Sequence, residues 1–230
     1  MSKQVIIIFG PPGAGKGTQS ELLSEKLGHY HLESSKVLER CFKNESLDKV
    51  FSVGGKDYSV GDEIENWKTG ALTSPPFITG LMMKEFNKLA EADEGFILSG
   101  SPRTLYEAEK EMPVLEELYG KENIRIFMLE ISAEITVFRN THRKICELMR
   151  HSILFNKETA VLTLCPLDGS KLVKRKDLDD PETIKTRLVQ YKERTLPLFN
   201  YFAAHRFNIN KVNAERTVAE VHEEIIRAMQ

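Results

Sequence analysis

The 230-residue sequence has few cysteines, no long apolar run and no excess of charge of one sign. Its three cysteines, Cys41, Cys146 and Cys165, are too few for the disulfide framework of a small secreted domain. No apolar stretch approaches the roughly 20 residues that a membrane-spanning helix needs. The 32 basic and 34 acidic residues nearly cancel, so no general positive surface indicates nucleic-acid binding. We therefore expect a cytoplasmic protein that binds neither nucleic acid nor a membrane.

An apolar strand pattern, Val5–Phe9, runs directly into a glycine-rich segment, Gly10–Thr18 (GPPGAGKGT). The segment fits the G-x-x-x-x-G-K-[ST] pattern, except that Gly17 separates Lys16 from the hydroxyl residue. Glycines let backbone amides wrap around phosphate oxygens, and the helix that follows directs its positive end toward them. The lysine adds a mobile positive charge. The pattern therefore predicts a phosphate-binding loop made of Gly10, Pro12, Gly13, Ala14, Gly15, Lys16, Gly17 and Thr18.

Four further segments have the length and apolar character of strands, namely 30–33, 95–99, 125–131 and 207–212. Helical patterns separate them, and this alternation predicts a parallel sheet covered by helices on both faces. Ligands of such folds bind beyond the C-terminal ends of the strands, where the glycine-rich loop and Gly100 fall. The predicted fold is α/β, with a P-loop NTPase-like five-stranded parallel sheet flanked by helices.

Two segments resemble motifs of one enzyme family. Gly10–Thr18 matches the G-x-P-G-[AS]-G-K-G-T loop of adenylate kinases and related nucleoside monophosphate kinases, and Gly95–Thr104 (GFILSGSPRT) resembles their G-F-x-L-D-G-F-P-R-T motif. The resemblance continues in the family's order over nearly the whole chain. It implies a core P-loop domain with an inserted acceptor-binding (nucleoside monophosphate) subdomain and an inserted lid. The expected core comprises 1–33, 77–143 and 175–230, the acceptor-binding subdomain 34–76 and the lid 144–174.

The resemblance also implies a set of cationic residues around the transferred phosphoryl group. Arg103 matches the arginine that grips the acceptor phosphate, and Arg139 matches the arginine that stacks on the donor base. One arginine alone is more often a solvated surface charge, but phosphoryl transfer depends mainly on positioning and charge stabilisation, which several together supply. The expected catalytic residues are Lys16, Arg103, Arg143, Arg175 and Arg187.

The acceptor side departs from the family pattern. Lys36 and Ser99 stand where the family has two aspartates that organise water around Mg²⁺, so metal binding should be weakened or relocated. Glu39 stands at an arginine position, and Arg40 is displaced by one residue, about 100° around a helix. Glu107 replaces the glutamine that reads the AMP base, so CMP, UMP and GMP stay candidate acceptors together with AMP. The expected acceptor-site residues are Ser34, Arg40, Gly70, Leu72, Gly100, Arg103 and Glu107.

The lid sequence contains a partial zinc pattern. Some family members hold the lid with zinc through C-x-x-C and C-x-x-[CD], and the matching positions here are Cys146, Met149, Cys165 and Asp168. Methionine is a poor zinc ligand, and His151 is a nearby substitute. The other interpretation is a lid held by packing, in which the cysteines are small apolar fillers.

The sequence thus predicts an ATP- and Mg²⁺-dependent phosphotransferase that resembles adenylate kinase and acts on a nucleoside monophosphate, AMP foremost. Two alternatives stay open: an ATP-binding sensor without catalysis, and a P-loop kinase for another small acceptor. The lost aspartates motivate the first alternative. We expect a monomer, because a moving lid and acceptor subdomain leave limited surface for a partner.

Overall fold

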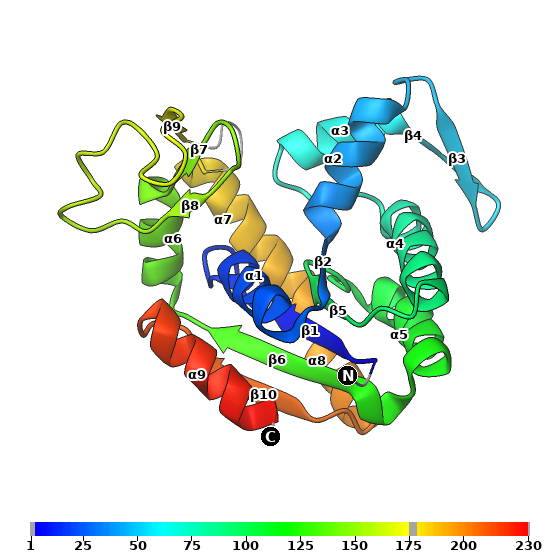
Figure 1. Ribbon diagram of the computed structural model, residues 1–230. Helices are drawn as coiled ribbons and strands as arrows, with labels where there is room; N and C mark the ends of the chain where they lie inside the picture. Colours follow the sequence, from blue (N-terminus) through cyan, green and yellow to red (C-terminus); the bar gives the residue numbers. More distant parts are fainter. Residues whose placement is uncertain (1–2, 175–178, 230) are drawn as a thin grey trace.

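The computed structural model describes residues 3–174 and 179–229. A central sheet of five parallel strands has the order β10-β6-β1-β5-β2 (Figure 1). The α/β fold predicted from the sequence is confirmed, and the four further strands lie within two residues of their predicted bounds. The strands are β1 (Val5–Phe9), β2 (Tyr30–Glu33), β5 (Phe96–Ser99), β6 (Ile124–Glu130) and β10 (Ile209–Asn213).

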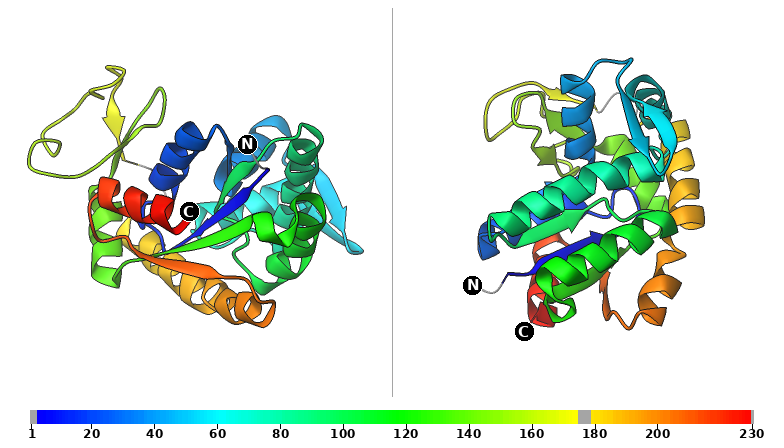
Figure 2. Two further views of the ribbon diagram at one scale, coloured as in Figure 1. Left: turned by 60° about the horizontal axis from the view of Figure 1, so that its bottom comes forward. Right: turned by 90° about the vertical axis from the view of Figure 1, so that its right-hand side faces the viewer.

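Helices cover both faces of this sheet, as can be followed in Figure 2. One face packs against α1 (Lys16–Leu27) and α9 (Val218–Met229). The other packs against α4 (Pro75–Glu91), α5 (Leu105–Tyr119) and α8 (Leu198–Ala204). Because both faces of the sheet are covered, the central strands consist mainly of consecutive apolar residues and not of alternating apolar and polar residues.

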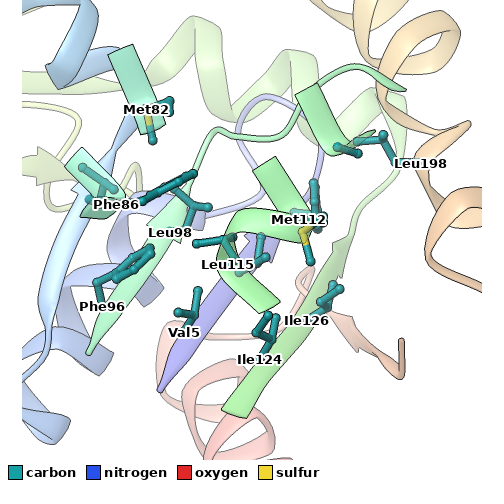
Figure 3. Close-up of a cluster of buried hydrophobic side chains, with 14 of the residues drawn as sticks. Val5, Met82, Phe86, Phe96, Leu98, Met112, Leu115, Ile124, Ile126 and Leu198 are labelled. Carbon is teal, nitrogen blue, oxygen red and sulfur yellow. The ribbon is translucent and has the colours of Figure 1, made fainter. Parts of the chain in front are cut away.

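Strand β1 shows how one apolar run serves two cores. All of its residues are buried, because β5 and β6 pair with it on either side. Successive side chains point to opposite faces, so Ile6 and Ile8 join the α1–α9 side, whereas Val5 and Ile7 join the α4–α5–α8 side. Figure 3 shows the second core, in which Phe86 of α4 lies beside Phe96 of β5.

The first predicted insertion contains a small hairpin. Strands β3 (Val50–Val53) and β4 (Lys56–Ser59) pair antiparallel. The turn consists of Gly54 and Gly55, both with positive φ (59° and 77°), which glycine adopts without strain. Helices flank the hairpin, namely α2 (Ser34–Asn44) and α3 (Val60–Lys68).

The second predicted insertion contains a three-stranded antiparallel sheet, which in Figure 1 lies beyond α6 (Ala133–His142). Strand β7 (Lys144–Cys146) lies between β8 (Ser152–Ile153) and β9 (Leu172–Val173). The chain returns to the core through α7 (Pro181–Gln190). The assignment of the two insertions as acceptor-binding and lid subdomains stays a prediction.

Two short helical segments complete the described part of the chain. A 3₁₀ turn, η1 (Lys121–Asn123), precedes β6, and a π-helical segment, η2 (Tyr191–Thr195), continues α7 toward α8. None of the helices in the described residues combines the length and apolar character that crossing a membrane requires.

The stack of Phe86 on Phe96 provides a test of the core. Phe86 is fully buried, and its ring centroid lies 5.7 Å from that of Phe96, with the ring planes 15° apart. We expect Phe86→Ala to lower the free energy of unfolding by about 3–5 kcal/mol, because the cavity cannot collapse fully. Urea unfolding measures this. Leu47→Ala, at a 62% exposed position, should change it by less than about 0.5 kcal/mol, and equal losses in the two variants would contradict the packing described.

Candidate active site

The glycine-rich loop between β1 and α1 fits closely against neighbouring elements. A Cβ atom at Gly10 would lie 2.7 Å from the carbonyl oxygen of Leu129, and one at Gly13 would lie 2.5 Å from Nδ2 of Asn140. Gly13 also has a φ of +82°, which L side chains rarely adopt. Glycine at these positions therefore lets the loop pass close to β6 and α6, and the loop ends where α1 begins at Lys16.

Lys16 is held against the loop it follows. Its Nζ donates hydrogen bonds to the carbonyl oxygens of Gly10 (2.7 Å) and Pro11 (2.9 Å). Burial lowers the pKa of the Lys16 amine well below its ordinary value. The guanidinium groups of Arg103, Arg187 and Arg143 lower this pKa further, and the Glu33 carboxylate opposes them. Three arginines from separate segments thus act on the same ammonium group.

Arg103 lies in the loop that follows β5. Its Nε donates to the carbonyl oxygen of Gly100 at 2.7 Å, and the Ser34 hydroxyl donates to the same oxygen at 2.7 Å. From η2, the Thr195 hydroxyl donates to the carbonyl oxygen of Arg103 at 2.9 Å. Burial lowers the pKa of Arg103. Thr195 of η2 therefore holds the main chain of this arginine, and the Gly100 carbonyl, which Ser34 of α2 also bonds, holds its side chain.

Arg143 and Arg187 share one buried carboxylate, Asp179, whose side chain is 1% exposed. Arg143 donates to both oxygens of Asp179, with its Nε at 3.1 Å from Oδ2, and to Oδ1 of Asn140 at 3.0 Å. Nη1 of Arg187 lies 4.0 Å from Oδ1 of Asp179. The sequence analysis did not identify Asp179 as a site residue. The acidic pair Asp179-Asp180, between Arg175 and Arg187 in the sequence, was an available signal. The predicted Arg175 lies outside the described residues.

Lys16, Arg103 and Arg187 line one pocket at the C-terminal ends of the strands. Its lining includes eight residues predicted from the sequence, namely Gly10, Pro12, Lys16, Gly70, Leu72, Gly100, Arg103 and Arg187. Gln190, Tyr191 and Thr195 also line it and were not predicted. They follow Arg187 at helical spacing, which was the available signal. Their segment includes the π-helical turn η2, a feature often found at functional sites.

Other predicted residues lie beside this pocket or away from it. Arg139 donates to the carbonyl oxygens of Gly13 (3.5 Å) and Glu215 (3.4 Å), next to the loop. Gly17 and Thr18 form the first turn of α1, and Ala14 is buried in the loop.

Three predicted acceptor-site residues, Ser34, Arg40 and Glu107, are not among the described residues that line this pocket, and Ser34 instead bonds Gly100 as described above. Arg40 forms an ion pair with Glu85 of α4 at 3.1 Å. Glu107 is 2% exposed, and its carboxylate accepts hydrogen bonds from the Arg103 amide and the Thr104 hydroxyl, each at 2.8 Å. The structure therefore directs Glu107 into the loop and not toward a ligand base.

The predicted lid cluster forms in three dimensions. One ligand atom each from Cys146, His151, Cys165 and Asp168 lies within 4.8 Å of the others. Nδ1 of His151 lies 3.5 Å from Sγ of Cys146, 3.6 Å from Sγ of Cys165 and 3.2 Å from Oδ2 of Asp168. Met149 is 64% exposed, and His151 occupies the fourth place instead. Two thiols, an imidazole and a carboxylate form a donor set that suits tetrahedral zinc.

A parallel sheet with a phosphate-binding loop after its first strand, and with cationic residues around that loop, defines a P-loop nucleotide-binding protein. The family model described as adenylate kinase matches residues 8–207. The chain is 29% identical to an adenylate kinase of Caldicellulosiruptor bescii, over 97% of this chain and 98% of that protein. It is 32% identical to an adenylate kinase of Mycoplasma capricolum subsp. capricolum, over 94% and 93%. The chain belongs to the adenylate kinase family, and it is an ATP-dependent phosphotransferase.

The Asp179 contacts generate a test that needs no substrate. Asp179→Ala leaves Arg143 and Arg187 without their shared buried carboxylate, and we expect the free energy of unfolding to fall by about 3 kcal/mol. Asp48→Ala, which removes an exposed carboxylate, should change it by less than about 0.5 kcal/mol. Urea unfolding of both variants decides the matter, and indistinguishable midpoints would show that Asp179 holds neither arginine.

Proposed function

We propose that this protein catalyses reversible transfer of the γ-phosphoryl group of ATP to AMP. The observation that carries the proposal is the convergence of Lys16, Arg103, Arg143 and Arg187 from four separate segments. The charges of the three arginines all act on Lys16, beside the phosphate-binding loop and an adjoining pocket. Like charges placed so closely repel, and a polyanion is the ligand that relieves this repulsion.

Each cation is assigned a role from its position. Lys16 and the loop amides hold the donor phosphates, and Arg139, beside Gly13, packs against the donor base. Arg103, held at the end of β5, grips the acceptor phosphate. Arg143 and Arg187 bind the equatorial oxygens of the phosphoryl group as it moves. These contacts stabilise the charge of the transition state without any proton transfer by the protein.

Magnesium serves ATP in this family, and the chain offers oxygen ligands for it in changed positions. The amine of Lys36 lies 3.6 Å from the carboxylate of Glu33, and a serine hydroxyl occupies position 99. Hard oxygen donors nearby are the Thr18 hydroxyl and the Glu33 carboxylate, whose charge raises the pKa of Lys16. Thr18 and Glu33 would hold the ion. When bound, it neutralises charge on the β- and γ-phosphates.

AMP is the acceptor that the observations favour. The argument for CMP, UMP or GMP came from a carboxylate at position 107 that would face the base. Glu107 points into its own loop, which removes that argument. The relatives compared above are called adenylate kinases, which supports AMP.

The two insertions complete the proposed machinery. We assign residues 34–76 to acceptor binding, because Gly70 and Leu72 line the pocket. We assign residues 144–174 to a lid that closes over the phosphates and excludes water. The enzyme is proposed to work as a cytoplasmic monomer, since ATP and AMP are found inside cells and both insertions must move freely.

The proposal includes a structural zinc ion in the lid. Cys146, His151, Cys165 and Asp168 supply four ligand atoms of types that zinc prefers. The three strands of this insertion are only two or three residues long, too short for a stable independent sheet, so an ion would add the missing stability.

The proposed reaction is tested by phosphorus NMR with MgATP and, separately, AMP, CMP, UMP, GMP and dTMP. We expect ADP from AMP, with a rate that falls about a hundredfold or more in Lys16→Ala and in Arg103→Ala. Lys110→Ala removes an exposed charge on α5 and should keep the activity of the wild type. Tight ATP binding without turnover of any acceptor would instead favour the sensor.

The zinc ion is tested by elemental analysis of protein purified without chelators. We expect about one equivalent in the wild type and in Cys41→Ser, whose cysteine lies on α2, and less than about a tenth in Cys165→Ser. A chelator should also lower the Tm of the wild type but not that of Cys165→Ser. Metal-free wild-type protein would show that hydrogen bonds alone hold the cluster.

A further inference from the structure

Three buried side chains behind Arg103 form a polar cluster that the proposed reaction does not use. Ser101, Glu107 and Glu111 are 1%, 2% and 0% exposed. Oγ of Ser101 lies 2.8 and 3.0 Å from the two carboxyl oxygens of Glu111 and 3.2 Å from Oε2 of Glu107. Glu107 and Glu111 are one helical turn apart on α5, so both face the loop that carries Ser101.

The number of protons in this cluster follows from the donors available. A serine hydroxyl can donate only one hydrogen bond, and an ionised carboxylate can donate none. Ser101 lies within hydrogen-bonding distance of both carboxyl groups. If Glu107 and Glu111 were both ionised, one of these contacts would join two acceptors in a buried site, which is strongly unfavourable. One carboxyl group must therefore carry a proton.

The surrounding hydrogen bonds indicate which carboxyl group this is. Glu107 accepts from the Arg103 amide (2.8 Å) and the Thr104 hydroxyl (2.8 Å), and such donors favour the ionised form. Ser101 is the only hydrogen-bond partner of Glu111 among the described side-chain contacts. The ladder then runs from the Glu111 O–H to Ser101, from the Ser101 O–H to Glu107, and from the Arg103 N–H to Glu107.

Charged and titratable groups around the cluster agree with this order. Burial raises the pKa of Glu111 well above its ordinary value, and the charge of Glu107 raises it further. Burial also raises the pKa of Glu107, against the hydrogen bonds and the positive charge of Arg103. From β2, Glu33 acts on Arg103. Helix α8 packs on α5 and carries Tyr201, whose phenol is neutral at neutral pH because burial raises its pKa. Helix α4 and strand β6 contribute apolar core side chains.

We infer that Glu111 stays protonated at neutral pH and acts as a positioning residue for Arg103. Its proton directs the Ser101 hydroxyl toward Glu107, which then holds the main-chain N–H of the arginine. The inference rests on the proposed function in one respect, the grip of Arg103 on the acceptor phosphate. Ser101 and Glu107 are both departures from the family motifs described above. The hydrogen bonds from Glu111 to Ser101 and from Ser101 to Glu107 join them in one network.

The first test follows stability against pH and requires no substrate. Unfolded Glu111 loses its proton above about pH 4.5, whereas the folded residue keeps it, so the wild type loses stability as pH rises toward the folded pKa. Glu111→Gln imitates the protonated acid and does not titrate. We expect its Tm advantage over the wild type to grow steadily between pH 5 and pH 8. Glu117→Gln, an exposed control on the same helix, should track the wild type.

The second test measures the KM for AMP. We expect Glu111→Leu, which cannot donate a hydrogen bond, to raise the KM for AMP on the order of tenfold and to leave the KM for ATP unchanged. Glu111→Gln should keep the wild-type value. As the pH is raised above neutrality the wild type should lose AMP affinity once Glu111 ionises, whereas Glu111→Gln should not.

The outcomes separate the two proposals. A Tm difference that does not change with pH would overturn the protonated state of Glu111, and an unchanged KM for AMP in Glu111→Leu would overturn its positioning role. A wild type that neither binds nor phosphorylates AMP would overturn the proposed function and the positioning role with it. The stability result would still stand in that case, because it depends on the carboxyl group alone.

Discussion

The concentration of positive charge at one end of the sheet is the constraint on which the rest of the site depends. Lys16 and three arginines lie close enough for each guanidinium to lower the pKa of the lysine. Among the described residues, nearby oxygen atoms relieve this repulsion. The carbonyls of Gly10 and Pro11 hold the lysine, and the carboxylate of Asp179 holds two of the arginines. A phosphate chain supplies the same kind of oxygen atoms in larger number, which is why the arrangement suits a nucleotide.

The fold makes this concentration possible because parallel strands end at the same edge. The phosphate-binding loop follows β1, the Arg103 loop follows β5, and Ser34 follows β2, and these three strands are neighbours in the sheet. Close approach then depends on small residues. A Cβ at Gly100 would lie 2.5 Å from the Ser34 hydroxyl, and Gly13 meets Asn140 in the same way. Glycine thus sets how near the segments can come.

Two departures from the family motifs, Ser101 and Glu107, belong to the same buried network. At the sequence level, Glu107 suggested a changed base specificity, because its counterpart in the family reads the AMP base. The structure instead joins it to Ser101 and Glu111 in one buried network. Sequence reasoning missed this because Glu111 belongs to no motif, and its meaning depends on a serine ten residues earlier. Asp179 was missed for a similar reason, since its partners are 36 and 8 residues away.

The sequence by itself determined the strands of the central sheet, the phosphate-binding loop and the residue types of the cysteine-containing cluster. These features depend on short-range patterns, namely apolar runs and the spacing of glycines and cysteines. Only the tertiary structure decided that His151 replaces Met149 in the cluster, that Arg40 pairs with Glu85, and that Glu107 points away from the pocket. The direction of a side chain depends on neighbours that are distant in sequence, and a local sequence pattern does not identify those neighbours.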